Sequence, residues 1–348
     1  MLFVTNRVLE QGLTPRPDTG SEFRLNRSVN FVLDNNQAEQ SFYCCRRDGL
    51  YDYTEVGSAN FFDEIKQLNA DQMLFFIHGF SVLPEQVFEQ TEKLQRLLDE
   101  RHQSEPSGSV KKNPKIAVIP LIWPCDNDFG KVKDYFDDQK AADASGTAYM
   151  RLLQKFLEWR EENSTLNNPC LKRVNVLSYS MGNRVLRNAL SLSVKYYPQN
   201  TLSLLFRNVF MAAADVVNES LEPDGAGGMI PVMSRNVVVY YAADDLALRA
   251  SKIANAGNSS ASRRLGHTGP ENMDRVPRNV YAVDCDDFNN IYDDPLGHSY
   301  FLDDPATGDA GLLLRHAYAC MRTGRVPEAH SVTQINRMEI LNESGLRD

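Results

Sequence analysis

The sequence predicts an α/β fold in which helices cover both faces of a mostly parallel sheet. From residue 70 onward, short continuous apolar runs alternate with segments whose apolar residues recur at helical spacing. The apolar runs lack the polar alternation of half-exposed strands, so we expect both of their faces to be buried. The 348 residues are 42% hydrophobic and 24% charged, which excludes disordered and fibrous classes.

The first 57 residues are expected to be β-structure, and the rest to alternate. Pro84 suits the first turn of a helix, and Pro198 ends another. Expected strands occupy residues 1–5, 28–33, 42–46, 73–77, 116–123, 174–177, 204–212, 236–242 and 280–283. Expected helices occupy residues 84–101, 147–159, 181–197, 247–254 and 312–321. We expect a single domain over 1–348, with a β-rich N-terminal extension over 1–60 and loops at 104–114, 216–234 and 256–278.

Charge and cysteine usage exclude several classes of protein. The net charge of −9 argues against nucleic acid as a partner. No apolar run is long enough for a membrane span, and residues 1–7 are too short for a signal peptide. The six cysteines form no C-x-x-C pair and fit no zinc site, so they indicate reduced thiols and a cytoplasmic protein. The sequence gives no information on oligomeric state.

The segment 174–182, Val-Asn-Val-Leu-Ser-Tyr-Ser-Met-Gly, is the most informative one. It predicts a strand, a sharp turn and then a helix, the arrangement that exposes a nucleophile above a parallel sheet. Residues two before and two after the nucleophile must be small, because backbones crowd there. Ser180 meets this condition with Ser178 and Gly182, whereas Ser178 as nucleophile would place Val176 at the crowded position. Ser180 is therefore the candidate nucleophile.

A nucleophilic serine needs a histidine base and an acid, which follow it in the order acid, then histidine. His298 lies in a loop after the last expected strand, where the base is expected, and we prefer it to His267, which precedes that strand. The expected strand at 236–242 leads into Asp244 and Asp245, one of which would accept the imidazole N–H while the other caps the next helix. Asp215, after the preceding strand, is the third candidate acid.

An oxyanion hole needs two backbone donors. The N–H of Met181 follows the nucleophile directly, and the N–H of Phe80 lies in the His-Gly-Phe loop after the strand at 73–77. His78 is expected to brace that loop. Dinucleotide, P-loop and zinc-protease motifs are absent, so we expect no cofactor and no metal. The loop from 284 to 309 carries eight aspartates and no Lys or Arg, which we interpret as a solvated acidic loop.

Six short motifs, in this order, resemble a bacterial family of α/β-hydrolase-fold proteins of unknown function. They are Val-Thr-Asn-Arg at 4–7, Phe-Ile-His-Gly-Phe at 76–80, Ile-Trp-Pro at 122–124, Ser-Met-Gly-Asn-Arg-Val at 180–185, Asp-Leu-Ala-Leu at 245–248 and Gly-His-Ser-Tyr-Phe at 297–301. The resemblance implies the α/β-hydrolase fold and selects Asp245 over Asp244 as the acid. Tyr179 stands where the family usually has histidine, a change expected to alter the wall of the pocket.

These residues together predict a serine hydrolase with the triad Ser180, His298 and Asp245. Its partner would be a small-molecule acyl substrate, and an ester or thioester is favoured because of its better leaving group. The alternative is a non-catalytic binding or scaffold protein that retains the fold. The acyl chain and the pathway cannot be deduced from the sequence, nor can the presence of a lid.

Overall fold

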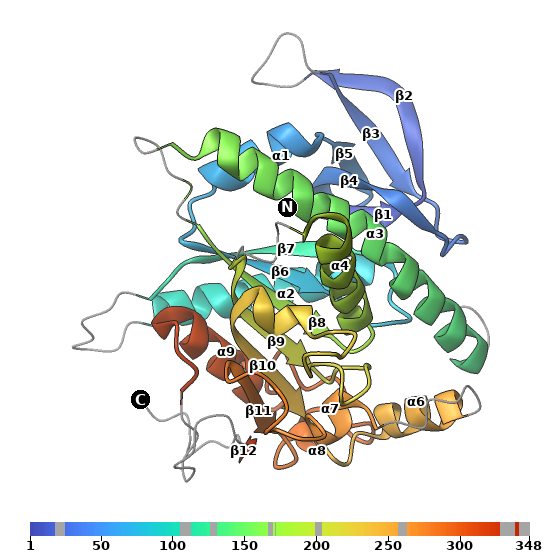
Figure 1. Cartoon of the computed structure of the whole chain (residues 1–348). Helices are drawn as coiled ribbons and strands as arrows, with labels where there is room; N and C mark the ends of the chain where they lie inside the picture. Colours follow the sequence, from blue (N-terminus) through green and yellow to red (C-terminus); the bar gives the residue numbers. More distant parts are fainter. Residues whose placement is uncertain are drawn as a thin grey trace.

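The computed structural model describes residues 1–17, 25–104, 113–125, 131–165, 170, 172–198, 204–256, 263–327 and 338–340. Within them, twelve strands form one sheet, in the order β12-β11-β10-β9-β8-β6-β7-β1-β4-β5-β3-β2 (Figure 1). The α/β-hydrolase fold predicted from the sequence, with its mostly parallel sheet, is confirmed.

The parallel part of the sheet carries the site. Its strands are β6 (Gln72–Ile77), β7 (Ile116–Ile122), β8 (Arg173–Tyr179), β9 (Phe206–Ala212), β10 (Ser234–Tyr241), β11 (Val280–Asp284) and β12 (Met338–Ile340). Neighbouring strands in this part pair parallel throughout. Their carboxyl ends therefore lie along one edge of the sheet, which is where ligands bind in open α/β sheets.

The N-terminal strands are antiparallel and continue the same sheet. They are β1 (Leu2–Arg7), β2 (Leu9–Pro17), β3 (Leu25–Phe31), β4 (Ala38–Gly49) and β5 (Asp52–Glu55). The first of them, β1, pairs parallel with β7 on one side and antiparallel with β4 on the other. The predicted β-rich extension is thus joined to the parallel strands by backbone hydrogen bonds.

Helices pack on both faces, as the sequence predicts. The helices are α1 (Ser58–Gln67), α2 (Pro84–Gln103), α3 (Lys131–Asn163), α4 (Gly182–Tyr196), α5 (Met229–Val232), α6 (Leu246–Ala256), α7 (Leu265–Thr268), α8 (Asn289–Tyr292) and α9 (Leu312–Thr323). On β6, Met73, Phe75 and Ile77 join the core under α1, α3 and α4, whereas Leu74 and Phe76 join the core under α2 and α9. This alternation explains why the strand is apolar at every position from Met73 to Ile77.

Several helices depart from the sequence prediction. The short helices α5 and α7 lie in the segments 216–234 and 256–278, which were expected to be loops, and α8 was not predicted. The helix expected at 147–159 begins earlier, at Lys131. Its first turns were not predicted because the side chains that they bury are small or polar, among them Asp138, Ala142 and Ser145, and so show no apolar periodicity. Helix α1 was not predicted, although Phe61, Phe62 and Ile65 lie on one helical face and are buried. In α3, the turns that were missed are those whose buried side chains are small or polar, because the helical periodicity in a sequence is read from apolar residues.

Candidate active site

The predicted nucleophile lies in a strained turn between β8 and α4. Ser180 has a φ of 51°, a left-handed conformation that is uncommon outside glycine. Its N–H donates to the carbonyl of Ala212 at 2.9 Å. The side-chain amide of Asn183 donates to the carbonyls of Ser178 and Ser180, at 3.0 Å each. Asn183 thus stabilises the turn, a role that sequence reasoning missed.

The crowding predicted around this turn is present. A Cβ atom on Gly182 would lie 2.5 Å from the carbonyl oxygen of His78 and 2.7 Å from that of Ile77, so only glycine fits without a backbone shift. Ser178 is fully buried on the strand side of the turn. Helix α4 therefore begins in direct contact with the end of β6, and Ser180 is presented at the carboxyl edge of the sheet.

The structure brings Ser180, His298 and Asp245 together. The Nε2 atom of His298 lies 2.9 Å from the Ser180 Oγ, and its Nδ1 lies 2.6 Å from an oxygen of Asp245. An ionised Asp245 can only accept, so Nδ1 carries the proton and Nε2 is left to accept the serine hydroxyl. Asp245 is fully buried, and its second oxygen accepts the N–H of Leu248 at 2.9 Å. Asp245 thus both orients the imidazole and caps α6, whereas we expected Asp244 and Asp245 to share these two roles.

The other two candidate acids have different partners. Asp244 accepts hydrogen bonds from the side-chain amides of Asn289, at 2.6 Å, and Asn290. Asp215 accepts from Tyr135 at 2.8 Å and from Ser251 at 2.6 Å.

A buried ion pair completes the surroundings of Asp215. The Nε atom of Arg264 lies 3.2 Å from the Asp215 carboxylate, and both side chains are nearly fully buried. Burial also raises the pKa of Tyr135, which keeps its hydroxyl protonated and donating. The carboxylate of Asp215 is therefore held by α3, α6 and Arg264, and His298 is paired with Asp245 instead.

The loop that carries His298 is anchored by residues that the sequence analysis treated as solvated. One oxygen of Asp293 accepts the backbone N–H groups of His298 and Ser299, at 2.8 and 2.7 Å. A Cβ atom on Gly297 would lie 2.4 Å from the side-chain oxygen of Asn290, and its φ is 61°, so glycine is required there. Part of the acidic loop is therefore structural, because the carboxylate of Asp293 holds the backbone at His298 in place.

The predicted oxyanion loop follows β6 and lies against the nucleophile. A Cβ atom on Gly79 would be 3.3 Å from the Cβ of Ser180, so the glycine permits the close approach. The N–H of Ser81 donates to the buried carboxylate of Asp138 on α3 at 3.0 Å. Among the described residues, the N–H groups of Phe80 and Met181 have no acceptor. They are available to a ligand, as an oxyanion hole requires.

His78 braces this loop, as expected. Its ring stacks on Trp123 at 5.1 Å, and its Nδ1 lies 2.8 Å from the carbonyl oxygen of Gly79. The indole N–H of Trp123 donates back to the carbonyl of His78 at 2.9 Å. Burial lowers the pKa of His78 to about 3, so this imidazole is neutral at physiological pH.

The remaining candidate residues have partners of their own. His267 accepts a hydrogen bond from Arg249 at 3.3 Å, whereas Ser180 and Asp245 bind His298. Tyr179 forms part of the wall of the site: its ring stacks on Phe301 at 4.3 Å, and its hydroxyl bonds Ser299 at 2.9 Å. The six cysteines are buried, and no disulfide joins any two of them. The described part of the chain contains no cluster of side chains arranged to hold a metal.

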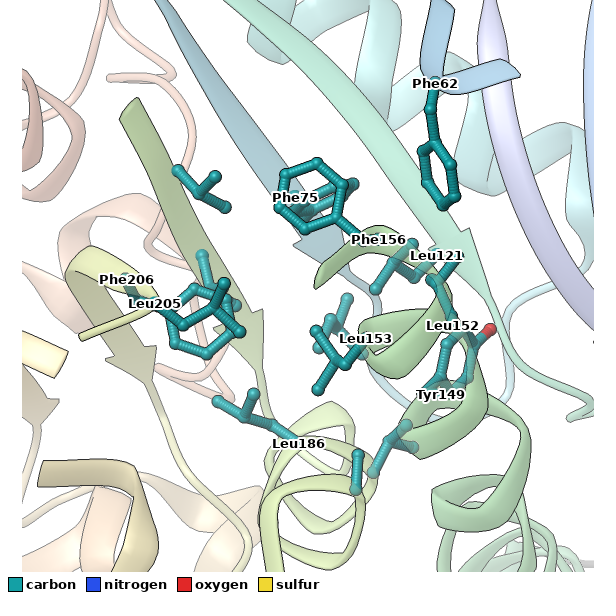
Figure 2. Close-up of a pocket in the computed structure, with 15 residues that line it drawn as sticks. Phe62, Phe75, Leu121, Tyr149, Leu152, Leu153, Phe156, Leu186, Leu205 and Phe206 are labelled. Atoms are coloured by element: carbon teal, nitrogen blue, oxygen red, sulfur yellow. The ribbon is translucent and has the colours of Figure 1, made fainter. Parts of the chain in front are cut away.

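An apolar cavity lies elsewhere, between α3, α4 and the sheet (Figure 2). Its walls include Phe75, Tyr149, Leu153, Leu186 and Phe206. The space inside is about 30 Å³, enough for roughly one water molecule and too small for an acyl chain. The triad does not line this cavity, so it is a gap in core packing that gives no information on the substrate.

Comparison with known proteins identifies the family. Residues 55–315 match the model of a family described as alpha/beta hydrolase of unknown function (DUF900), and the match covers most of the chain. The protein belongs to this family. It has the family's fold. At the carboxyl edge of its sheet, a serine is hydrogen-bonded to a histidine, which is hydrogen-bonded to an aspartate.

No curated protein matches the chain. Among solved structures, phospholipase PlaB from Legionella pneumophila, in complex with thio-NAD, is similar at 14% identity and a TM-score of 0.24. That match covers 64% of this chain and 39% of the other. A similarity at this level carries no argument about activity. Among the helices that the structure describes, none has both the length and the hydropathy needed to cross a bilayer.

Proposed function

We propose that the protein is a serine hydrolase that cleaves an ester or thioester through an acyl-enzyme intermediate. The observation that carries the proposal is the continuous chain of hydrogen bonds from Ser180 through His298 to the buried Asp245. The strained turn at Ser180 adds support, because strained backbone concentrates at functional sites. The order Ser, Asp, His along the chain is that of the α/β-hydrolase fold.

In the acylation step, the Ser180 Oγ attacks the acyl carbonyl while His298 Nε2 takes the hydroxyl proton. Asp245 keeps the other ring nitrogen protonated and stabilises the imidazolium that forms. The negative charge on the carbonyl oxygen is accepted by the N–H groups of Phe80 and Met181. Collapse of the tetrahedral intermediate breaks the bond to the leaving oxygen or sulfur, which receives the proton from His298.

In the deacylation step, His298 removes a proton from water, and the resulting hydroxide attacks the acyl carbon. The second tetrahedral intermediate expels Ser180, which regains its proton from His298. The buried Asp245 and the anchored loop around His298 keep the imidazole in one orientation through both steps. The proposed steps use only groups of the protein and water. The preference for esters and thioesters over peptides rests on leaving-group chemistry and fold analogy.

Two inferences about context accompany the reaction. We infer a small-molecule acyl substrate, because the acidic chain lacks the electrostatic features of a nucleic-acid binder. We also infer a cytoplasmic location, because six buried cysteines without a disulfide are typical of a reducing compartment.

A panel of p-nitrophenyl esters of increasing chain length, assayed with matched serine variants, tests the proposal. Ser180→Ala should lose about six orders of magnitude in turnover, since removal of a triad serine has had that effect in subtilisin. Ser178→Ala is the matched control, two residues away on β8 and equally buried, and should retain turnover. Full turnover by Ser180→Ala would contradict the assignment. A wild-type protein inactive on every ester would favour the non-catalytic alternative.

A further inference from the structure

A buried carboxyl group on α3 lies against the loop that follows β6. The side chain of Asp138 is fully buried, and its Oδ2 atom accepts the N–H of Ser81 at 3.0 Å. Burying a carboxyl group is costly unless hydrogen bonds compensate for the lost water. The N–H that Asp138 binds is the one that directly follows Phe80, the residue whose own N–H is a candidate oxyanion donor.

The hydrogen bond to Asp138 is made at a strained position of the backbone. Ser81 has a φ of 56°, close to the 51° of the candidate nucleophile Ser180. A residue other than glycine keeps such a conformation only where its surroundings enforce it. The bond from the Ser81 N–H to Asp138 is a contact of this kind, so the conformation of the loop depends on α3.

The peptide group on the other side of Phe80 is held as well. The Nδ1 atom of His78 lies 2.8 Å from the carbonyl oxygen of Gly79, and because a carbonyl can only accept, Nδ1 carries the proton. The peptide bond between Gly79 and Phe80 is trans, so its C=O and N–H point in opposite directions. A Gly79 carbonyl that faces His78 therefore directs the N–H of Phe80 away from His78. Asp138 fixes the next peptide group through Ser81.

Helix α3 contacts the same loop a second time and is also linked to the nucleophile. The ring of Tyr135, one turn before Asp138, meets the ring of Phe80 edge-on at 5.9 Å. The hydroxyl of Tyr135 donates to Asp215 at 2.8 Å, and the N–H of Asp215 donates to the carbonyl of Ser180 at 3.2 Å. One helix thus contacts the Phe80 loop directly and the Ser180 turn through Asp215.

These contacts matter because an oxyanion hole is sensitive to the position of its donors. Each donor must lie about 2.7–3.1 Å from the place where the negative charge develops. The N–H of Met181 is fixed by the turn between β8 and α4, which it shares with Ser180. The N–H of Phe80 belongs to a loop, so its distance from Ser180 depends on the contacts of that loop.

We propose that Asp138 is a positioning residue: by holding the N–H of Ser81, it keeps the N–H of Phe80 in place to bind the oxyanion. This inference rests on the hydrolase function proposed above and deepens it. Asp138 acts through the backbone of the loop, and the oxyanion forms only in the transition state. Removing the carboxylate should therefore lower kcat and leave KM nearly unchanged.

Steady-state kinetics with the p-nitrophenyl ester that the wild type cleaves fastest test the inference. Asp138→Ala should lower kcat by about 10²-fold, the lower end of the loss seen when an oxyanion donor is removed, with KM within about threefold of wild type. Asp138→Asn keeps an oxygen that can accept the Ser81 N–H, although without the charge, and its loss in kcat should be only about tenfold. The asparagine variant keeps the volume of the side chain, so it carries the test if the alanine variant does not fold.

An alkyl trifluoromethyl ketone supplies a measurement that a merely structural role would not change. The Ser180 Oγ adds to the carbonyl carbon of the ketone, the electron pair of the C=O bond moves to oxygen, and the hydroxyl proton passes to His298. The hemiketal oxygen then occupies the oxyanion hole without further reaction. In the Asp138 variants the inhibition constant should rise by the factor by which kcat/KM falls, because both report stabilisation of the same negative oxygen.

Ser145→Ala is the matched control. Ser145 is also fully buried on α3, two turns after Asp138, where its hydroxyl accepts from Asn6 at 2.9 Å and donates to the carbonyl of Ala141 at 2.7 Å. Its variant should lose stability, measured as melting temperature, and keep the kcat and the inhibition constant of the wild type.

The outcomes separate this inference from the hydrolase function. The inference alone is overturned if the wild type cleaves the ester while folded Asp138 variants keep its kcat and inhibition constant. It is equally overturned if their loss falls on KM alone, or if Ser145→Ala loses as much kcat as Asp138→Ala. A wild-type protein that neither cleaves the ester nor binds the ketone overturns the proposed function, and this inference with it.

Discussion

The neighbouring strands β9 and β10 each lead into a buried aspartate. Asp215 follows β9, the strand adjacent to the one that carries Ser180, and its N–H donates to the carbonyl of Ser180 at 3.2 Å. Asp245 follows β10, one strand further away. The more distant aspartate is nevertheless the one that meets His298.

The two carboxylates differ in the hydrogen-bond and ion-pair partners that surround them. Asp215 is enclosed by Tyr135, Ser251 and the buried Arg264, which use its oxygens. One oxygen of Asp245 accepts a backbone N–H at the start of α6, and the other faces the imidazole of His298. Proximity in the sheet is therefore a poor guide to function, and the set of available partners is a better one.

The largest effect should come from removing the charge of Asp245. Asp245→Asn should lower turnover on the best ester by about 10⁴-fold, because an amide stabilises the wrong histidine tautomer, as in another triad. Asp244→Asn is the matched control: it weakens the bonds to Asn289 and Asn290, with a loss of about 1–3 kcal/mol in unfolding free energy and turnover within a few-fold of wild type. If Asp244→Asn is the inactive variant, the acid is assigned one residue too late.

Asp215→Asn should affect stability far more than chemistry. It leaves the guanidinium of Arg264 buried without its counter-charge, and the unfolding free energy should fall by about 3–5 kcal/mol. Adding Arg264→Gln should recover part of this loss, which a double-mutant cycle by urea unfolding would measure. A 10⁴-fold loss of turnover in folded Asp215→Asn, with Asp245→Asn active, would reverse the two roles.

The same contrast extends to the histidines. His298 faces a carboxylate, whereas His78 and His316 are buried with neutral partners, and burial lowers their pKa values to about 3 and about 4. A histidine whose pKa is lower in the folded state binds fewer protons there than it does in the unfolded chain. Its contribution to the free energy of unfolding is therefore complete above pH 6.5 and is lost as the pH falls. At pH 5 each should remove about 2 kcal/mol of unfolding free energy. His316→Gln should flatten the slope measured between pH 7 and 5, and an unchanged slope would contradict this account.

The smallest of these effects concerns the crowded turn. Ser178→Val should destabilise the protein by about 1–3 kcal/mol, because a branched side chain must enter a fully buried position. Ser178→Gly should be tolerated with its activity intact. Melting temperatures and ester turnover for the pair check the claim. A stable, fully active Ser178→Val protein would mean that the turn is looser than the geometry at Gly182 indicates.

Much of the parallel sheet could be predicted from the sequence because its strands are buried on both faces. Strands β6 to β11 fall within a few residues of the expected ranges, and the turn at Ser180 was located because strand, small residues and helix follow in order. The pairing of His298 with Asp245 was predicted from chain order and family resemblance.

Features held by polar contacts could not be predicted in this way. The first turns of α3 bury Asp138 and Ser145, so they have no apolar stripe to detect, whereas the helix expected at 247–254 is present as α6 although α6 also buries Ser251 and Asn255. The role of Asp293 depends on a backbone contact within its own loop, where eight aspartates look alike in sequence. A carboxylate gives no sign in the sequence of whether it will meet solvent, a backbone N–H or a guanidinium.

Labelling with a fluorophosphonate, followed by peptide mapping, shows whether Ser180 is an activated nucleophile. The reagent forms a covalent adduct only with a serine activated by a neighbouring base, and it requires no knowledge of the substrate. The account predicts one adduct, on Ser180, which disappears in His298→Ala and is slowed in Asp245→Asn. An adduct on another residue, or labelling of Ser180 that persists without His298, would contradict the hydrolase site described here.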